Sequence, residues 1–421
     1  MAHGGLSRLT RGLMMAGLVG APAGLFAEDI KYQPVDAAAP AIILSGYVDT
    51  SIMARFGEAS SSHGTAGFPN TLRSPGRLYD DPAKNDGFNL NAASLAFDKP
   101  LDDSRWASGF HAQVLMGPDA ALRNLYSLAG NPTDIGLNEA YGVLRAPLGN
   151  GLETRIGYFS SPLGYEVYDS ARNPNYSRSY GFYLEPKSHT GVTLNYSLTE
   201  WLGLMAGVAN NYSPFLNARS VDPWDDAYLA LLTLNGAWFG QPDAQLKLGY
   251  TGGHTATSAP TDTGPRIHNF YAGAHLPLPV KGLTLGLTYD YQANYAAGVP
   301  AVFFFPAGPG ESYANATGLY LNYAVARWQF NTRAEYASAT AGNTILVNYD
   351  PFGSNKPMFG AHDDKFFGLT ETVDYRLWRN VVSRIEFRWD RDLTGGVPAF
   401  GSAANPRKDS FTLALNLIYL F

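Results

Sequence analysis

The sequence predicts an all-β fold, a transmembrane antiparallel up-and-down β-barrel of about sixteen strands. Three observations predict it. Segments of about ten residues alternate apolar and polar side chains, as strands with two different faces do. The connections between these segments are alternately long and short. The first residues of the chain have the pattern of an export signal.

The last segment shows the alternation most clearly. Apolar and aromatic side chains occupy every second position from Phe411 to Phe421, and Thr412 and Asn416 lie between them. An unpaired apolar strand promotes aggregation in water, whereas a closed barrel pairs its last strand with its first. We also expect Tyr419 and Phe421 to act as an assembly signal, because they resemble the C-terminal aromatic pattern that the barrel-assembly machinery recognises in bacterial outer-membrane proteins.

The N-terminal segment predicts export. Arg8 and Arg11 precede a short apolar core and a run of small residues, so residues 1–27 form a predicted signal peptide, cleaved after Ala23 or Ala27. Residues 28–40 form a predicted periplasmic N-terminal tail, and 41–421 form the predicted barrel domain.

Composition excludes several classes of protein. Charged residues make up 16% of the chain and the net charge is −6 without a basic block, so no nucleic-acid partner is expected. Mean hydropathy is −0.15, which disfavours a helical membrane protein. Cysteine is absent, which rules out disulfides and thiolate chemistry.

The predicted strands are numerous and their loops are sorted by length. Connections such as 160–186 are long, and those such as 198–200 are tight, which is typical of barrels with long outer loops and short periplasmic turns. The alternative is a soluble β-sandwich, which has no reason to sort its loops in this way. We expect strands at about 42–56, 88–98, 106–117, 137–146, 152–159, 187–197, 202–211, 227–238, 244–252, 267–276, 283–293, 314–325, 328–338, 366–377, 381–391 and 410–421.

Two segments depart from simple alternation. The stretch from Phe88 to Asp98 changes phase midway. Glu371 falls on the apolar face of its strand, where a charge is costly at the membrane midplane, so it lies near a rim or a bulge changes the register there.

Six short motifs occur in order along the first half of the chain: Leu44–Thr50 (LSGYVDT), Gly87–Asn91 (GFNLN), Asn138–Tyr141 (NEAY), Ile156–Glu166 (IGYFSSPLGYE), Asn175–Tyr180 (NYSRSY) and His189–Val192 (HTGV). Together they resemble the bacterial OmpL-like family, also called β-barrel porin type 2. The resemblance implies an outer-membrane porin and gives no substrate.

The third long loop is a candidate constriction, because a wide barrel needs an inserted loop to narrow it. We expect its charged residues to filter solutes, and the alternative is that the loop caps the outside. These residues are Glu166, Asp169, Arg172 and Arg178.

Charged residues on the polar strand faces are candidates for lining a channel. Their mixed signs predict weak ion selectivity at most, and the alternative is that they only keep the lumen hydrated and support the barrel. They are Glu139, Arg145, Arg155, Asp290, Arg333, Glu335, Arg384, Glu386, Arg388 and Asp390.

The sequence predicts no enzyme. Motifs of metalloproteases, serine hydrolases and nucleotide-binding proteins are missing; His362 beside Asp363 is only a weak metal hint, and Phe303–Phe305 more readily packs locally than binds solute. We therefore expect a porin of the Gram-negative outer membrane that lets small hydrophilic solutes diffuse passively, without cofactor or metal. A surface adhesin and an outer-membrane hydrolase are the alternatives. Which solute passes, which loop narrows the pore and whether the barrel is a homotrimer stay open.

Overall fold

The computed structural model describes residues 42–56, 86–120, 135–212, 216–219, 226–237, 240–255, 266–295, 311–340, 364–395, 398, 400–402 and 405–421. The predicted signal peptide, the predicted N-terminal tail, Phe303–Phe305 and the pair His362–Asp363 lie outside the described residues. No helix in the described part of the chain is long and apolar enough to cross a membrane.

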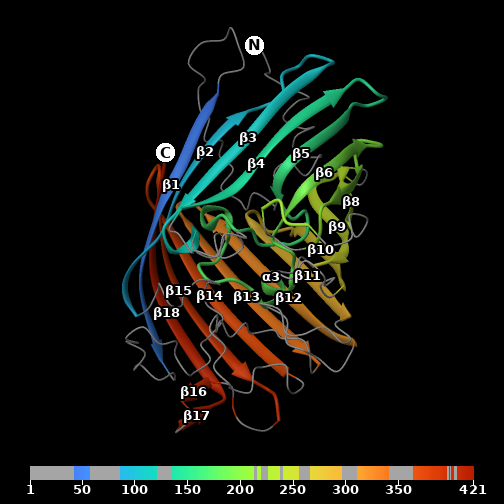
Figure 1. Ribbon diagram of the computed structural model, residues 1–421. Helices are drawn as coiled ribbons and strands as arrows, with labels where there is room; N and C mark the ends of the chain where they lie inside the picture. The colour runs from blue at the N-terminus through green and yellow to red at the C-terminus, as the bar shows by residue number, and fades with distance from the viewer. Residues whose placement is uncertain are drawn as a thin grey trace.

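Sixteen strands of the described chain form one closed antiparallel barrel (Figure 1), as the sequence predicted. Each strand pairs with its neighbours in chain order, and the last strand pairs with the first. The barrel strands are β1 (Ile43–Phe56), β2 (Gly87–Lys99), β3 (Ala107–Met116), β4 (Ile135–Ala146), β5 (Leu152–Ser160), β6 (Ser188–Ser197), β7 (Leu202–Ala209), β8 (Ala227–Gly236), β9 (Gln241–His254), β10 (Arg266–Pro277), β11 (Leu283–Tyr295), β12 (Glu311–Val325), β13 (Trp328–Ala339), β14 (Asp364–Trp378), β15 (Val381–Asp392) and β18 (Asp409–Leu420).

A small hairpin interrupts the last long connection. It consists of β16 (Phe400–Ser402) and β17 (Asn405–Arg407), which pair only with each other. Figure 1 shows this hairpin at one end of the barrel and the C-terminus at the other. The short turns lie at the C-terminal end; the two tightest join β12 to β13 through Ala326 and Arg327, and β14 to β15 through Arg379 and Asn380.

The seam between β1 and β18 is closed along its whole length. Residues from Tyr47 paired with Leu420 to Phe56 paired with Phe411 stay in one register. Beyond it, the Gly46 and Phe421 backbones exchange two hydrogen bonds of 2.9 and 3.0 Å. The last residue therefore takes part in barrel closure, and no strand edge is left open at the seam.

The two faces of the wall have opposite chemistry. Along β18, Leu413, Leu415 and Leu417 are exposed on the outside, while Ala414 and Asn416 between them are buried inside. Large apolar side chains are exposed in the same way on strands around the whole barrel. Such a continuous apolar surface would be costly in water and suits lipid.

Bulges explain the phase change in β2 and a similar one in β4. The pairing of β1 with β2 shifts at Asp49 and Thr50, so Asn91 is the extra residue and turns inward, where it is fully buried. The pairing of β3 with β4 shifts in the same way, and Asn138 turns inward there. Both bulges aim an amide side chain at the interior, a common use of this irregularity.

Glu371 keeps the regular register of β14, so of the two predicted alternatives, a position near a rim or a bulge, the bulge is wrong. It pairs with Thr332 and Phe387 and is exposed on the outer face. The bulge in β14 lies instead between Arg376 and Trp378. The Thr332 hydroxyl donates a hydrogen bond of 2.7 Å to the Glu371 carboxylate, which satisfies part of its hydrogen-bonding capacity.

The connection from β5 to β6 folds into the barrel, and we refer to residues 161–187 as the inserted loop. It contains the short helices η1 (Ser170–Arg172) and α3 (Tyr180–Leu184). The Ser179 hydroxyl caps α3 by accepting a hydrogen bond of 3.1 Å from the Phe182 amide. Figure 1 shows α3 within the barrel beside β11, β12 and β13, which it contacts.

Candidate functional site

The inserted loop is locked to the barrel wall by a cluster of ions. Arg333 on β13 donates hydrogen bonds to Glu166 of the loop (2.8 Å) and to Glu335 (3.0 Å). Arg388 on β15 lies 2.8 Å from Asp390 and 3.3 Å from Glu335. The side chains of all five residues are at most 1% exposed. We refer to these five residues as the ionic cluster.

The loop backbone completes the hydrogen bonding of this cluster. The Tyr180 amide donates to Glu335 at 2.5 Å, and the Tyr180 hydroxyl donates to Asp390 at 2.7 Å. Arg388 donates to the Arg178 carbonyl at 2.5 Å. Buried charges are tolerated only when they are paired and their remaining lone pairs and protons are used, a condition that the loop fulfils here.

Two further wall charges hold the middle of the loop. Glu386 accepts hydrogen bonds from the amides of Tyr176 (2.6 Å) and Ser177 (2.9 Å). Arg384 pairs with Asp374 at 3.0 Å and donates to the Asn173 carbonyl at 2.7 Å. The predicted lining residues on β13 and β15 thus lie inside the barrel, but they contact the loop and are shielded from solvent.

Arg178 lies in the loop and is fully buried. Its guanidinium donates to the carbonyls of Tyr176 (3.0 Å) and Tyr168 (3.3 Å) and lies 5.6 Å from the Phe182 ring centroid. Its charge therefore stabilises the fold of the loop itself, and it is not accessible to a solute.

A second anchor holds η1 against the seam. Asp49 on β1 is fully buried and accepts hydrogen bonds from Asn91 (2.8 Å), Asn416 (2.5 Å) and the Ser170 hydroxyl (2.5 Å). These partners come from β2, β18 and the loop. One carboxylate thus connects the first, second and last strands to the inserted segment.

Asp290 and Glu185 form a buried carboxyl pair under α3. Both are less than 9% exposed, and a hydrogen bond joins their side chains. Burial raises the pKa of Glu185 to about 7, the nearby Lys187 opposes the shift, and Glu166 adds to it. Gly164, with φ of +115°, lies against the Glu185 carboxylate, where any side chain would collide with it.

The opposite side of the interior is more open. Arg155 on β5 is half-buried, and its guanidinium lies 4.5 Å from the centroid of the Tyr141 ring. Glu139 on β4 is also half-buried; it accepts a hydrogen bond from the Ser160 amide (2.7 Å) and lies 3.3 Å from His111. Arg172 is the exposed charge of the inserted loop.

Asp169 and Arg145 are placed differently from each other. Asp169 is half-buried beside η1, where partial desolvation raises its pKa and the charge of Arg172 opposes the shift. Arg145 lies at the short-turn end of β4, donates to the carbonyls of Asp102 and Ser104, and is 4.0 Å from Glu153. The predicted residues thus fall into three groups: those that are buried and anchor the loop, those on the more open side of the interior, and Arg145, which contacts a turn.

Several inward residues were not predicted. Lys247 on β9 lies between outward Leu246 and Leu248, so the alternation alone could have found it. Leu229 and Leu231 on β8 face the interior although their strand is apolar on both faces, and they pack with Leu163 of the loop. No local pattern in the sequence indicates this contact, because the wall and the loop segment are far apart along the chain.

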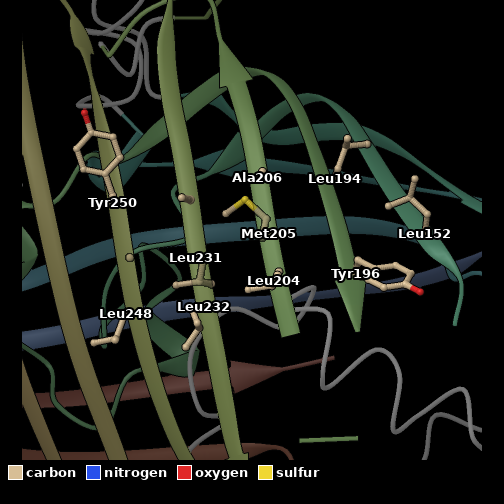
Figure 2. Close-up of a pocket in the computed structure, with 12 residues that line it drawn as sticks. Leu152, Leu194, Tyr196, Leu204, Met205, Ala206, Leu231, Leu232, Leu248 and Tyr250 are labelled. Carbon is tan, nitrogen blue, oxygen red and sulfur yellow. The ribbon is translucent and has the colours of Figure 1, made fainter. Parts of the chain in front are cut away.

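An apolar hollow of about 510 Å³ lies on the outer surface, across β5 to β9. Figure 2 shows Leu194, Leu204 and Leu248 around it. Leu204 is 41% exposed, whereas Met205 beside it is 8% exposed because it faces inward. Most of the side chains that line the hollow lie on the outer face, so it opens toward lipid, and the inward residues Met205 and Leu231 also border it.

Metal chemistry has no support among the described residues, where no group of three or more His, Cys, Asp or Glu side chains could hold an ion. The buried ion pairs described above are satisfied by each other and by loop backbone groups. Their arrangement explains how the loop is held in place.

Solved structures of several bacterial outer-membrane proteins have the same fold. The anion-selective porin from Comamonas acidovorans is 12% identical with a TM-score of 0.55; the match covers 90% of this chain and 99% of that one. The outer-membrane channel DcaP of Acinetobacter baumannii is 12% identical with a TM-score of 0.55, and the match covers 90% of this chain and 97% of that one. OmpT of Vibrio cholerae is 13% identical with a TM-score of 0.54, and the match covers 92% of this chain and 100% of that one. A search of curated proteins gave no match.

The closed barrel, its apolar outer surface and its inserted loop define an outer-membrane channel of the porin type. The family described as "Putative beta-barrel porin-2, OmpL-like" matches residues 41–421. The chain belongs to this family, as its motifs indicated, and its place is the bacterial outer membrane.

Proposed function

We propose that this protein is a porin through which small hydrophilic solutes diffuse passively down their gradients, without catalysis. The observation that carries the proposal is the interior of the barrel: the inserted loop is fixed to β13 and β15, while Arg155, Glu139 and Arg172 on the other side remain partly or fully exposed. A wide barrel narrowed on one side by a fixed loop leaves a hydrated path on the other.

The predicted constriction residues take separate roles in this proposal. Arg172 and Asp169 face the path as candidate filter residues, together with Arg155 and Glu139 on the wall. Glu166 and Arg178 hold the loop in position instead. The same anchoring role falls to Asp290, Arg333, Glu335, Arg384, Glu386, Arg388 and Asp390.

Recording from planar bilayers tests the proposal. Protein refolded in detergent, and shown by its heat-dependent gel mobility to be folded, should give discrete ohmic conductance steps. A heat-denatured sample is the blank. Folded protein without any conductance would overturn the porin proposal.

Cysteine labelling tests which part of the loop faces the path. The chain has no cysteine, so Arg172→Cys offers a single target for a bulky methanethiosulfonate reagent. Labelling should lower the single-channel conductance. Arg379→Cys, at the exposed turn between β14 and β15, is the matched control and should label without effect. Equal conductance after complete labelling of both variants would place Arg172 outside the path.

We further propose that the protein is a homotrimer. Its signal peptide is cleaved during export, and the C-terminal aromatic pattern directs its assembly into the membrane. One solved OmpT structure is described as a trimer form, which supports this assembly for a barrel of the same fold. Gel mobility without heating, together with chemical crosslinking in native outer membranes, checks it. A single protomer-sized species in both measurements would exclude the trimer.

A further inference from the structure

The charges inside the barrel are distributed unevenly: paired carboxylates lie on one side of the interior and, among the described residues, cations without a salt bridge lie on another. The carboxylates on β13 and β15 interact with close partners. Glu335 and Asp390 form ion pairs with arginines, and Glu386 accepts hydrogen bonds from loop amides. They are at most 3% exposed. A passing ion therefore does not meet their charge directly, and the mixed signs along these strands do not determine selectivity.

Cations remain on the open side. Lys247 on β9 faces inward, is 8% exposed and has no ion pair or hydrogen bond from its ammonium among the described residues. Arg155 contacts aromatic rings instead of a carboxylate, and its Nε atom is buried without a hydrogen-bond partner. Unpaired cations at the edge of a low-dielectric wall retain most of their field.

Arg172 brings a third positive charge into the same region. It extends from the inserted loop, is exposed, and lies within electrostatic range of both Lys247 and Tyr141, the residue on which Arg155 stacks. Between β5 and β9, the inward positions of β6 and β7 include Gly191 and Gly207, and also Thr193, Asn195 and Met205. The three cations thus come from β5, β9 and the inserted loop, and Arg172 is the charge that links the other two.

Carboxylates near this region have partners of their own. Glu139 accepts from the Ser160 amide and lies beside His111, which is also 2.6 Å from Asp98. Asp169 accepts hydrogen bonds from the Ala171 amide (3.1 Å) and Gln113 (3.4 Å). Glu153 lies 4.0 Å from Arg145, toward the short turns. None of them forms a salt bridge with Arg155 or Lys247 among the described residues.

From this sorting we infer that the solute path beside Arg155, Arg172 and Lys247 prefers anions, and that the solutes of this porin are small hydrophilic anions such as carboxylates or phosphates. The inference rests on the proposed porin function and adds its substrate class. Fixed cations in a narrow, partly desolvated path raise the local concentration of anions and repel cations.

The reversal potential under a KCl gradient tests the inference. The sign should show that chloride is more permeant than potassium. Lys247→Gln and Arg172→Gln should each lower the chloride-to-potassium permeability ratio by roughly threefold, as one unit charge acting over about 10 Å in a partly hydrated path would do. Arg172 is exposed in the loop, so its variant should fold even where a change at Lys247 interferes with folding. Lys281→Gln, in the exposed turn between β10 and β11, removes the same charge outside the path and should leave the ratio unchanged.

Solutes of matched size provide a second measurement. Liposomes that contain the protein should take up gluconate faster than glucosamine, because the two differ mainly in the sign of their charge. Arg172→Gln should narrow the difference. Channels that conduct but show no chloride preference, or that take up glucosamine at least as fast, would overturn the anion inference and leave the porin function intact. An absence of conductance would instead overturn the porin function on which the inference rests.

Discussion

Arg333 on β13 and Glu166 in the inserted loop form a 2.8 Å ion pair inside the barrel, and neither side chain is more than 1% exposed. The two residues are far apart in the sequence, and their contact connects the loop to the wall. Arg333 also binds Glu335 and the Ser177 carbonyl. Removing this one guanidinium leaves two buried carboxylates without their main cation.

Arg333→Met should therefore destabilise the barrel strongly. Breaking a buried pair from one side leaves an uncompensated charge, and the expected loss in the free energy of unfolding is about 3–5 kcal/mol. Urea unfolding in detergent micelles, followed by tryptophan fluorescence, measures it. Arg391→Met is the matched control, because Arg391 pairs with Asp409 at 2.9 Å while 44% exposed. Exposed pairs contribute about 0–1 kcal/mol, so similar losses in both variants would contradict the anchoring role of Arg333.

Asp49→Asn should weaken the seam and the loop together. Asp49 accepts three hydrogen bonds, from Asn91, Asn416 and Ser170. An asparagine would turn an NH₂ group toward donors, and lost hydrogen bonds to a charged group cost about 1.5–3 kcal/mol each. We expect a lower refolding yield and a lower urea midpoint. Asp103→Asn, in the exposed turn between β2 and β3, should change neither. An Asp49→Asn variant with the stability of the unaltered protein would show that the three contacts contribute little.

The strands could be predicted from the sequence, but the contacts through which the inserted loop covers part of their inner faces could not. Alternation identifies which side chains share a face, and it located all sixteen barrel strands within a few residues. It does not show what covers that face. Arg384 and Arg388 lie inside the barrel, but their burial depends on loop carbonyls more than 200 residues earlier in the chain. Local periodicity contains no information on such contacts.

Strand β8 shows the opposite difficulty. Leu229 and Leu231 face inward and Tyr228 faces outward, so the strand is apolar on both sides and its periodicity is weak. The inner apolar residues are explained only by Leu163 of the inserted loop, which packs against them. A buried loop makes part of a porin interior resemble a protein core, and sequence patterns for barrels do not anticipate this.

Stability should fall as the pH rises through the range in which Glu185 loses its proton. Its pKa is raised from 4.5 to about 7 by burial, so the folded state holds a proton that the unfolded state releases above about pH 4.5. The free energy of unfolding should therefore decrease between about pH 4.5 and 7 and level off above, by about 3 kcal/mol. The ionisable groups facing Glu185 are Asp290, Lys187 and Glu166.

The Glu185→Gln variant provides the comparison for this pH dependence. It keeps the shape of the side chain and removes the titration, so its urea midpoint should vary less between pH 5 and 8 than that of the unaltered protein. Parallel profiles for the two proteins would assign the pH dependence to another group.

The two roles of Phe421, in the seam and in assembly, can be separated experimentally. Its backbone exchanges two hydrogen bonds with Gly46, while its ring is exposed on the outer surface. Phe421→Ala keeps the backbone bonds, so refolding in detergent should be nearly unchanged. If the ring belongs to the assembly signal, the same variant should lower the fraction of folded barrel in outer membranes of living cells severalfold. Deleting Phe421 removes both features and should reduce both yields. Phe411→Ala, at the other end of β18, is the control for loss of an aromatic ring, and assembly of Phe421→Ala at its level in cells would exclude the ring as a signal.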